Sequence, residues 1–308
     1  MGNNTETQQM SKGQERRLAK KKAAAAQKRQ KKASKAIFIV AAAVIVCAIA
    51  AGITIFAVKK AKETKVVSDF SQGLTDDGKI AGVDVKSLTT VFDYKNITVK
   101  YSDIAYSDDD IQKDIETLLK DYETEDENGN KNTPEFNDEF VKEYLDMETV
   151  EEYKESVRAK NEETNLHEYL EKLLVSETKI SQIPQSYFKT LKGLRKYVDQ
   201  NQFEYYNNMF MQYYGQRMYK SFKDFTGMTD AEYEEYLTTS AMNDLKGDMG
   251  AQYIFETEGM IIPGHEYVEY AEDFASDAES QYGKGYIMKN LIHEKVMEFI
   301  QSNAKIEK

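Results

Sequence analysis

The chain has 308 residues, a formal net charge of −12, no Trp and a single Cys, Cys47. The charge is unevenly distributed along the chain. Residues 1–65 carry fifteen Lys and Arg against three Glu, so residues 66–308 have a net charge of about −24. The length allows one or two domains with a sizeable core. The absence of Cys after residue 47 excludes a disulfide framework in the acidic part.

Residues 1–35 contain eleven Lys and Arg but no aromatic residue and no periodic apolar pattern. A nucleic-acid-binding head is the alternative interpretation. A basic tail that sets membrane topology and touches anionic lipid accounts for the composition without a further role. We therefore predict a basic cytoplasmic tail and no nucleic-acid partner.

An uncharged run follows, "AIFIVAAAVIVCAIAAGITIFAV", Ala36 to Val58. At ~1.5 Å per helical residue, its 23 residues can cross a hydrocarbon core of ~30 Å. A buried core helix and a cleaved signal peptide are alternatives. The charged leader and the length of the run favour an uncleaved transmembrane helix over residues 36–58.

The positive charge is larger before this run than after it, so we expect the N-terminus in the cytoplasm and residues 66–308 outside. Cys47 suggests a lipoprotein, but Val46 stands before it where a small residue is expected. A cysteine in the middle of a span is more often an apolar filler. The prediction is a single-pass protein of the cell membrane.

Residues 59–87 are polar, contain several glycines and predict a linker. The alternation at Ile97 and Val99 predicts short strands, and Ser107 is placed to cap a helix. Residues 88–122 are therefore predicted to form short strands and a linking helix.

From residue 136 onward the pattern is almost entirely helical, with Pro184 suited to the first position of a helix. Two capping boxes mark helix starts: Thr149 with Glu152, and Thr229 with Glu232. Long helices joined by short loops predict a mainly α fold, an extended bundle with arms.

Residues that carry catalysis are scarce. His167, His265 and His293 are far apart in sequence, and position 297, where a zinc-protease motif beginning at His293 needs a second His, is Met. No glycine-rich phosphate loop or Gly-x-Ser-x-Gly motif occurs. We predict surface histidines, no catalytic residues, no metal and no cofactor.

Residues 187–228 contain seven Tyr, five Phe and four Met. Between residues 205 and 214 they cover most of the circumference of a helix, more than one buried stripe requires. The helix is either core on several sides, amphipathic with Tyr hydroxyls in water, or an exposed adaptable surface. An exposed surface of the last kind binds unfolded or varied polypeptides, which we call clients. On that interpretation the predicted client-binding residues are Tyr205, Tyr206, Met209, Phe210, Met211, Tyr213, Tyr214 and Met218.

Four segments in this order resemble the C-terminal domain of trigger factor, a bacterial chaperone family. They are "FNDEFVKEYLDMETVEEYKESVRAKNEETNLHEYLEKLL" (136–174), "ISQIPQSYFKTLKGLRKY" (180–197), "GMTDAEYEEYLTTSAMNDLKGDMGAQYIFETEGMIIPGHEYVEYAEDFA" (227–275) and "KVMEFIQSNAKI" (295–306). The resemblance implies a chaperone domain over residues 136–308, with helical arms that enclose a cradle for nascent chains.

The stretch "FDYKNITVKYSDIAYSDDDIQKDIETLL" resembles the family's segment just before its FKBP-like prolyl isomerase domain. Residues 123–135, an acidic turn with Asn128-Gly129, stand where that domain is expected. The family's ribosome-docking domain also has no counterpart here. The resemblance therefore implies a variant without isomerase activity or ribosome binding.

Together these observations predict a transmembrane helix followed by a trigger-factor-C-like (SurA-like) helical bundle with arms and a short β segment before it. The expected function is that of a bacterial membrane-anchored, extracytoplasmic, ATP-independent chaperone in protein folding and transport. Its expected partners are unfolded or nascent secreted polypeptides, and membrane lipid through residues 36–58. The alternatives are a prolyl isomerase or foldase, and a cell-surface scaffold or adhesion protein.

Overall fold

The computed structural model describes residues 64–125, 129–275 and 277–307. The predicted membrane span, residues 36–58, and the basic tail before it lie outside the described residues. Within the described part, none of the helices combines the length and the apolar character that a membrane crossing requires.

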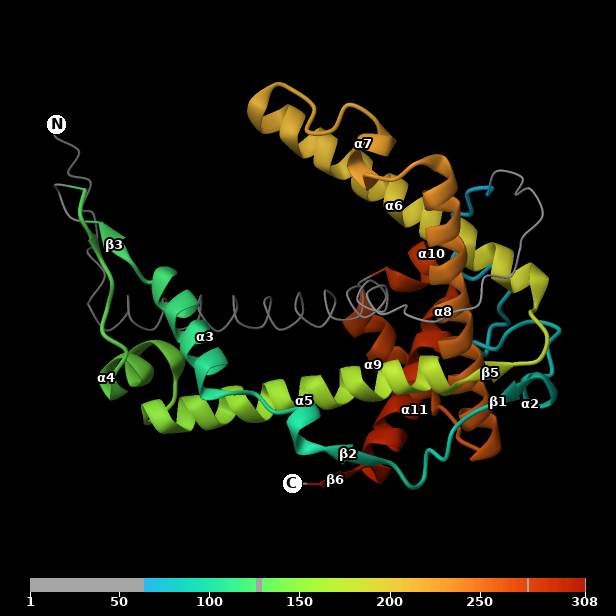
Figure 1. Cartoon of the computed structure of the whole chain (residues 1–308), viewed down its shortest axis with the longest axis horizontal. Helices are drawn as coiled ribbons and strands as arrows, with labels where there is room; N and C mark the ends of the chain where they lie inside the picture. The colour runs from blue at the N-terminus through green and yellow to red at the C-terminus, as the bar shows by residue number, and fades with distance from the viewer. Residues whose placement is uncertain (1–63, 126–128, 276, 308) are drawn as a thin grey trace, which may run out of the picture. The chain divides into compact units, whose positions relative to one another are not determined.

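The described chain is mainly helical, as predicted, with only short strands (Figure 1). It divides into two units, and the division falls inside two helices, α8 (Asp230–Thr257) and α11 (Lys284–Asn303). Unit 1 comprises the described residues up to Ala81, Pro184–Met242 and Ile261–Leu291. Unit 2 comprises Gly82–Ile183, Asn243–Met260 and Ile292–Lys308.

Unit 1 holds one long helix, several shorter ones and the first parts of α8 and α11. Its complete helices are α6 (Gln185–Tyr214), α7 (Phe222–Thr226), α9 (Gly264–Phe274) and α10 (Ala278–Tyr282). Most of its buried apolar residues lie on α6, α8 and α11, with Ile80 before α6 and Ala278 on α10: Ile80, Tyr187, Leu191, Leu194, Phe203, Tyr233, Leu237, Ala241, Ala278, Ile287 and Leu291.

Unit 2 holds the remaining helices and the strands. Its helices are α2 (Val85–Leu88), α3 (Asp108–Lys120), α4 (Asp138–Phe140) and α5 (Val150–Glu177), with a 3-10 turn η2 (Tyr101–Asp103) and a π-helical turn η3 (Val141–Leu145). Its strands are β1 (Thr89–Thr90), β2 (Thr98–Lys100), β3 (Thr124–Glu125), β4 (Lys131–Asn132), β5 (Lys179–Ile180) and β6 (Lys305–Glu307). Leu170, Leu174, Leu245, Met249, Ile254, Met297 and Ile300 are fully buried.

The predicted helix starts are found with the expected side-chain caps. Ser107 caps α3 by accepting from the Asp110 N–H at 3.2 Å. At the start of α8, Thr229 and Glu232 form both bonds of a capping box: the Glu232 carboxylate accepts from the Thr229 N–H at 2.7 Å, and the Thr229 hydroxyl accepts from the Glu232 N–H at 3.3 Å.

Two other helix starts differ in detail from the prediction. At α5 the Thr149 hydroxyl caps Glu152 as expected, but the Glu152 carboxylate accepts from the N–H of Glu148 instead of Thr149. Pro184 occupies the N-cap position of α6, one residue earlier than predicted. Because proline lacks an N–H, either position leaves no donor unsatisfied.

The described part of the predicted linker, residues 59–87, is packed rather than free. The Val67 N–H donates to the Gly193 carbonyl of α6 at 3.2 Å, and the Ser71 hydroxyl donates to the Tyr282 carbonyl at 3.0 Å. The ring of Phe70 contacts Tyr197, Tyr282 and Tyr286 edge to face. The glycines of this segment adopt positive φ in tight turns, so they mark a folded connection and not a flexible one.

The strands predicted within residues 88–107 exist, but their partners are distant in sequence. β1 pairs antiparallel with β5, and β2 pairs parallel with β6 near the end of the chain. Local alternation can indicate a strand but not a partner some 200 residues away, so β6 could not be predicted from the residues around it.

Candidate binding surfaces

The long helix α6 ends in a helical hairpin. Gly215 adopts the left-handed conformation, φ 69°, and its N–H donates to the Met211 carbonyl at 3.0 Å, which ends the helix. The chain then turns back, and the Tyr219 N–H donates to the buried Asn207 side chain at 2.8 Å. Figure 1 shows α7 lying along the C-terminal half of α6.

Aromatic rings hold this α6–α7 hairpin together and join it to the start of α8. Phe222 of α7 packs edge to face on Phe203 and on Tyr233, with ring centroids 5.7 and 5.1 Å apart. Phe225 contacts Phe203, Tyr206 and Tyr219. Such pairs contribute ~0.5–1.5 kcal/mol each beyond the area they bury, so the hairpin has a small aromatic core of its own.

A buried polar group lies at the base of the hairpin. Asp199 accepts from the Tyr233 hydroxyl at 3.0 Å and lies 3.2 Å from Nε of Arg195, whose guanidinium stacks on the ring of Tyr236. Burial raises the pKa of Asp199, although Arg195 and Tyr233 oppose that rise. These contacts hold α6 against α8 below the hairpin. The orientation of the α6–α7 hairpin relative to the start of α8 is therefore fixed.

Beyond this core, the end of the hairpin presents large apolar side chains to solvent. Five of the eight predicted client-binding residues are exposed, with relative exposures of 63% for Tyr205, 45% for Met211, 75% for Tyr213, 68% for Tyr214 and 44% for Met218. We call these five residues the tip surface. Tyrosine and methionine suit contact with varied partners, because the thioether is flexible and the phenol combines an apolar ring with a polar tip.

The other three predicted residues, Tyr206, Met209 and Phe210, are half-buried. Tyr206 contacts Phe225 of the hairpin core, and Phe210 packs on Tyr214 with ring centroids 4.5 Å apart. Two of the interpretations made from the sequence, a core helix and an exposed surface, therefore apply to different parts of α6. The first part of α6 is core, and its last turns are an exposed surface.

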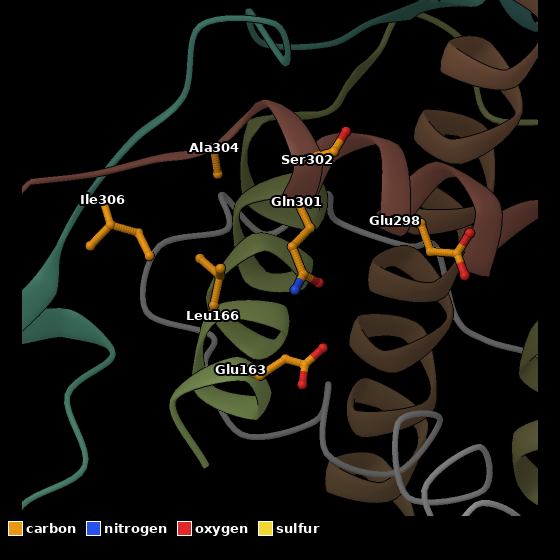
Figure 2. A pocket seen from close by; sticks show the side chains of 7 residues that line it. All are labelled: Glu163, Leu166, Glu298, Gln301, Ser302, Ala304 and Ile306. Carbon is orange, nitrogen blue, oxygen red and sulfur yellow. The ribbon is translucent and has the colours of Figure 1, made fainter. Parts of the chain in front are cut away.

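A second candidate is a pocket of about 470 Å³ in unit 2, between α5, the end of α11 and β6 (Figure 2). Ile306 and Leu166 lie on one side of it, and Glu298 lies on the other. The seven lining residues are Glu163, Leu166, Glu298, Gln301, Ser302, Ala304 and Ile306. The pocket thus combines an apolar part with two carboxylates.

Two of the histidines expected at the surface share a carboxylate. Nε2 of His293 contacts Oε1 of Glu171, and Nε2 of His167 lies 3.8 Å from the same oxygen. Both imidazoles are half-buried, whereas His265 is exposed. The i, i+4 spacing of His167 and Glu171 on α5 was the sequence signal for this cluster. In the described residues no group of three or more His, Cys, Asp and Glu could hold a metal ion.

The acidic turn after α3 is a short hairpin. β3 and β4 pair antiparallel, Thr124 with Asn132 and Glu125 with Lys131. Rings of Tyr122, Phe136, Phe140, Tyr144 and Tyr153 pack together where the chain enters α4 and α5. The described residues between α3 and α5 therefore form one pair of short strands and one aromatic cluster.

The fold is that of a mainly helical protein with exposed tyrosine and methionine side chains at the end of the α6–α7 hairpin. In sequence, the chain is similar to the protein named trigger factor of Caldicellulosiruptor saccharolyticus, with 25% identity over 222 residues, which is 63% of this chain and 49% of that protein. It is also 25% identical over 197 residues to trigger factor of Clostridium tetani, 57% of this chain and 42% of that protein. No family model matches the chain, and no solved structure gives a significant match.

These similarities support a trigger-factor-like relationship, in agreement with the resemblance seen in the four helical segments. The chain spans at most about half the length of these curated relatives. The similarities do not show the predicted membrane-anchored arrangement.

Proposed function

We propose that this chain is a membrane-anchored, extracytoplasmic chaperone that holds unfolded or newly translocated polypeptides without ATP or covalent chemistry. The observation that carries the proposal is the tip surface, where three tyrosines and two methionines are exposed together at the end of one hairpin. The similarity to proteins named trigger factor supports the same class of function.

Weak contact at many points is the mechanism that this surface favours. Each exposed ring or thioether of the tip surface can cover apolar groups of an incompletely folded chain without selecting one sequence. The body carries about −24 over residues 66–308, which keeps neighbouring molecules apart and attracts basic clients.

The proposed location rests on the sequence, through residues 36–58 and the excess of basic residues before them. Six peptide units separate Val58 from Thr64, so their Cα atoms can be at most ~20 Å apart. Thr64 itself is bound to unit 1: its N–H and hydroxyl donate to Glu234, and its carbonyl accepts from Lys196 at 2.9 Å.

A glycine allows this attachment. A Cβ at residue 193 of α6 would lie 2.4 Å from Cγ2 of Val67, so only glycine lets the segment lie against the helix there. From residue 193 to Tyr214, α6 extends ~32 Å. On this proposal the tip surface stays near polypeptides that emerge from the bilayer.

The test is suppression of aggregation of several unrelated denatured proteins by the full chain in lipid nanodiscs. A variant with Tyr205, Met211, Tyr213 and Tyr214 all changed to Ser should lose most of this activity at an unchanged melting temperature. The matched control changes four exposed polar neighbours, Glu204, Asn208, Gln212 and Gln216, to Ser.

Full activity in the four-site apolar variant would show that the tip surface is not the client site. Protection of one partner alone, with no effect on unrelated proteins, would support the scaffold alternative instead.

Topology is tested separately with protease added to intact cells whose wall has been removed. Residues 66–308 should be degraded, and the basic tail should be spared. Protection of the acidic body would reverse the proposed orientation.

The proposal also includes the absence of prolyl isomerase activity, because residues 123–135 replace the family's FKBP-like domain. The uncatalysed step takes ~10–100 s, so modest catalysis is measurable. Clear acceleration by the purified chain would contradict this part of the proposal.

A further inference from the structure

Strand β6 has one edge without a partner strand. In the described part of the chain, its sheet contains two strands, β2 and β6, which run parallel. The Lys305 N–H donates to the Ile97 carbonyl at 2.9 Å. Because alternate residues of a parallel strand bond to the same neighbour, Lys305 and Glu307 face β2, and the N–H and carbonyl of Ile306 face the opposite edge.

All three residues of β6 are exposed, and 48% of Ile306 is accessible to solvent. An edge strand of this kind is a template for one more strand, and proteins commonly block such edges with proline or a cover. β6 contains no proline. Its main chain is therefore available to an extended polypeptide.

The pocket lies beside this edge and shares Ile306 with it (Figure 2). Leu166 is 8% exposed and gives the pocket an apolar wall, and Glu163 and Glu298 bring two carboxylates to it. Glu298 also lies 3.7 Å from Lys295 on α11, an exposed pair of the kind that contributes little. The pocket is an open depression of about 470 Å³, so a side chain that enters it keeps part of its surface in water.

We propose that the free edge of β6 and this pocket bind an extended client segment in which Lys or Arg alternates with aliphatic residues. The client backbone adds to the edge at Ile306. The Lys or Arg side chains, which lie on one face of the added strand, enter the pocket, where their aliphatic stems meet Leu166 and their cations meet Glu163 and Glu298. This division follows the general pattern of strand addition, in which the main chain supplies affinity and side-chain pockets supply selectivity.

Charge selects this occupant over a second copy of the chain. Two copies joined through β6 would bring the same carboxylates of two strongly acidic bodies together. A basic, incompletely folded segment meets opposite charge at the same place. The inference rests on the proposed chaperone function and gives it a second, sequence-selective contact site.

The experiment measures binding of short fluorescent peptides to the full chain in nanodiscs by anisotropy. Alternating Val/Lys, Val/Ser and Val/Glu peptides are compared. We expect the Val/Lys peptide to bind most tightly, and Glu163→Gln with Glu298→Gln to weaken it about tenfold, with little change for Val/Ser. The charge-matched control is Glu155→Gln with Glu177→Gln, at two exposed positions of α5.

Ile306→Pro tests the main-chain contact. It removes an N–H that faces away from β2, a position where an edge strand tolerates proline, and both Val/Lys and Val/Ser should bind more weakly. Protection of the Val99 amide from exchange verifies that β2 and β6 remain paired.

Unchanged Val/Lys binding in the Glu163/Glu298 variant would overturn the proposal. So would a dimer that Ile306→Pro dissociates without any effect on peptide binding. The four-site tip variant should still bind the Val/Lys peptide, so loss of aggregation suppression there does not count against this site.

Discussion

The middle of α8 and the end of α6 look alike in sequence but differ in the structure. Both carry apolar residues around most of the helix. From Leu237 to Phe255, most positions of α8 are buried, and Leu237, Leu245, Met249 and Ile254 are fully inaccessible. From Asn208 to Tyr214, no residue of α6 is buried.

The difference follows from the size of the side chains. The buried part of α8 contains small residues, Ala241, Gly247, Gly250 and Ala251, which let neighbouring elements approach its backbone. A Cβ at Gly250 would lie 2.6 Å from Oγ1 of Thr178 and 2.9 Å from Cδ1 of Leu174. Residues 203–214 of α6 contain neither Gly nor Ala, and their tyrosines keep a polar tip that water satisfies.

The largest effect predicted by this comparison is at Leu245. Truncation of this fully buried side chain in Leu245→Ala should reduce the free energy of unfolding by ~2–5 kcal/mol, since it loses buried area and leaves a cavity. Met211→Ala at the tip should change it by less than ~0.5 kcal/mol. Denaturant unfolding followed by circular dichroism measures both, and equal costs would remove the distinction between the two helices.

Much of this organisation could be predicted from the sequence because it is local. The caps at Ser107, Thr149 and Thr229 depend on residues three positions apart, and the helical pattern from residue 136 onward predicted the helices on which Leu170, Leu174 and Leu245 are buried. The aromatic and methionine content of residues 187–228 located an unusual surface. It could not tell which turns of the helix were exposed.

That division depends on α7, which folds back and covers Phe203 and Tyr206 but not Tyr213. The packing of residues 64–87 and the pairing of β6 likewise depend on contacts between distant segments. Polar, glycine-containing composition is shared by linkers and by tight turns, so it could not separate them.

A smaller effect is expected at Gly250. Gly250→Ala should destabilise the protein by ~1–2 kcal/mol, because the buried Thr178 and Leu174 side chains cannot move away freely, even though alanine favours the helix by up to ~1 kcal/mol. The matched control is Gly264→Ala in the first turn of α9, where a Cβ would meet nothing within 4 Å. A stabilised Gly250→Ala variant would show that small residues are not what lets α8 be buried.

A local and pH-dependent effect is expected where Thr64 is bound. Burial tends to raise the pKa of Glu234, but hydrogen bonds from Thr64 and the neighbouring Lys192 outweigh it and lower the pKa below the usual 4.5. A lowered carboxyl pKa stabilises the folded state above the unfolded value, and that contribution is lost as the pH falls through the folded value. The protection factor of the Val67 amide, which donates to Gly193, should therefore fall below about pH 4.5, when its exchange rate is compared with the intrinsic rate at the same pH.

Glu234→Gln is the control for this titration, since it keeps the shape and removes the ionisable group. The variant should show a smaller protection factor for the Val67 amide at neutral pH, and that factor should not fall further in acid. A wild-type rate in Glu234→Gln at neutral pH would mean that Thr64 is not held by this carboxylate.

The smallest effects on stability are expected at the tip. Tyr213→Ser and Tyr214→Ser should each change the free energy of unfolding by less than ~0.5 kcal/mol, because both side chains are largely in solvent. Tyr206→Ser and Phe210→Ser should each cost more, about 1 kcal/mol or above, because both rings are half-buried and Tyr206 contacts Phe225.

If the tip surface holds clients, the capture of a denatured protein should fall in Tyr213→Ser and Tyr214→Ser although their melting temperatures stay the same. Thermal melting and light scattering on the same four variants separate the two quantities. Should Tyr213→Ser and Tyr214→Ser unfold as readily as Leu245→Ala, the end of α6 is core like the middle of α8, and the client surface must lie elsewhere on the chain.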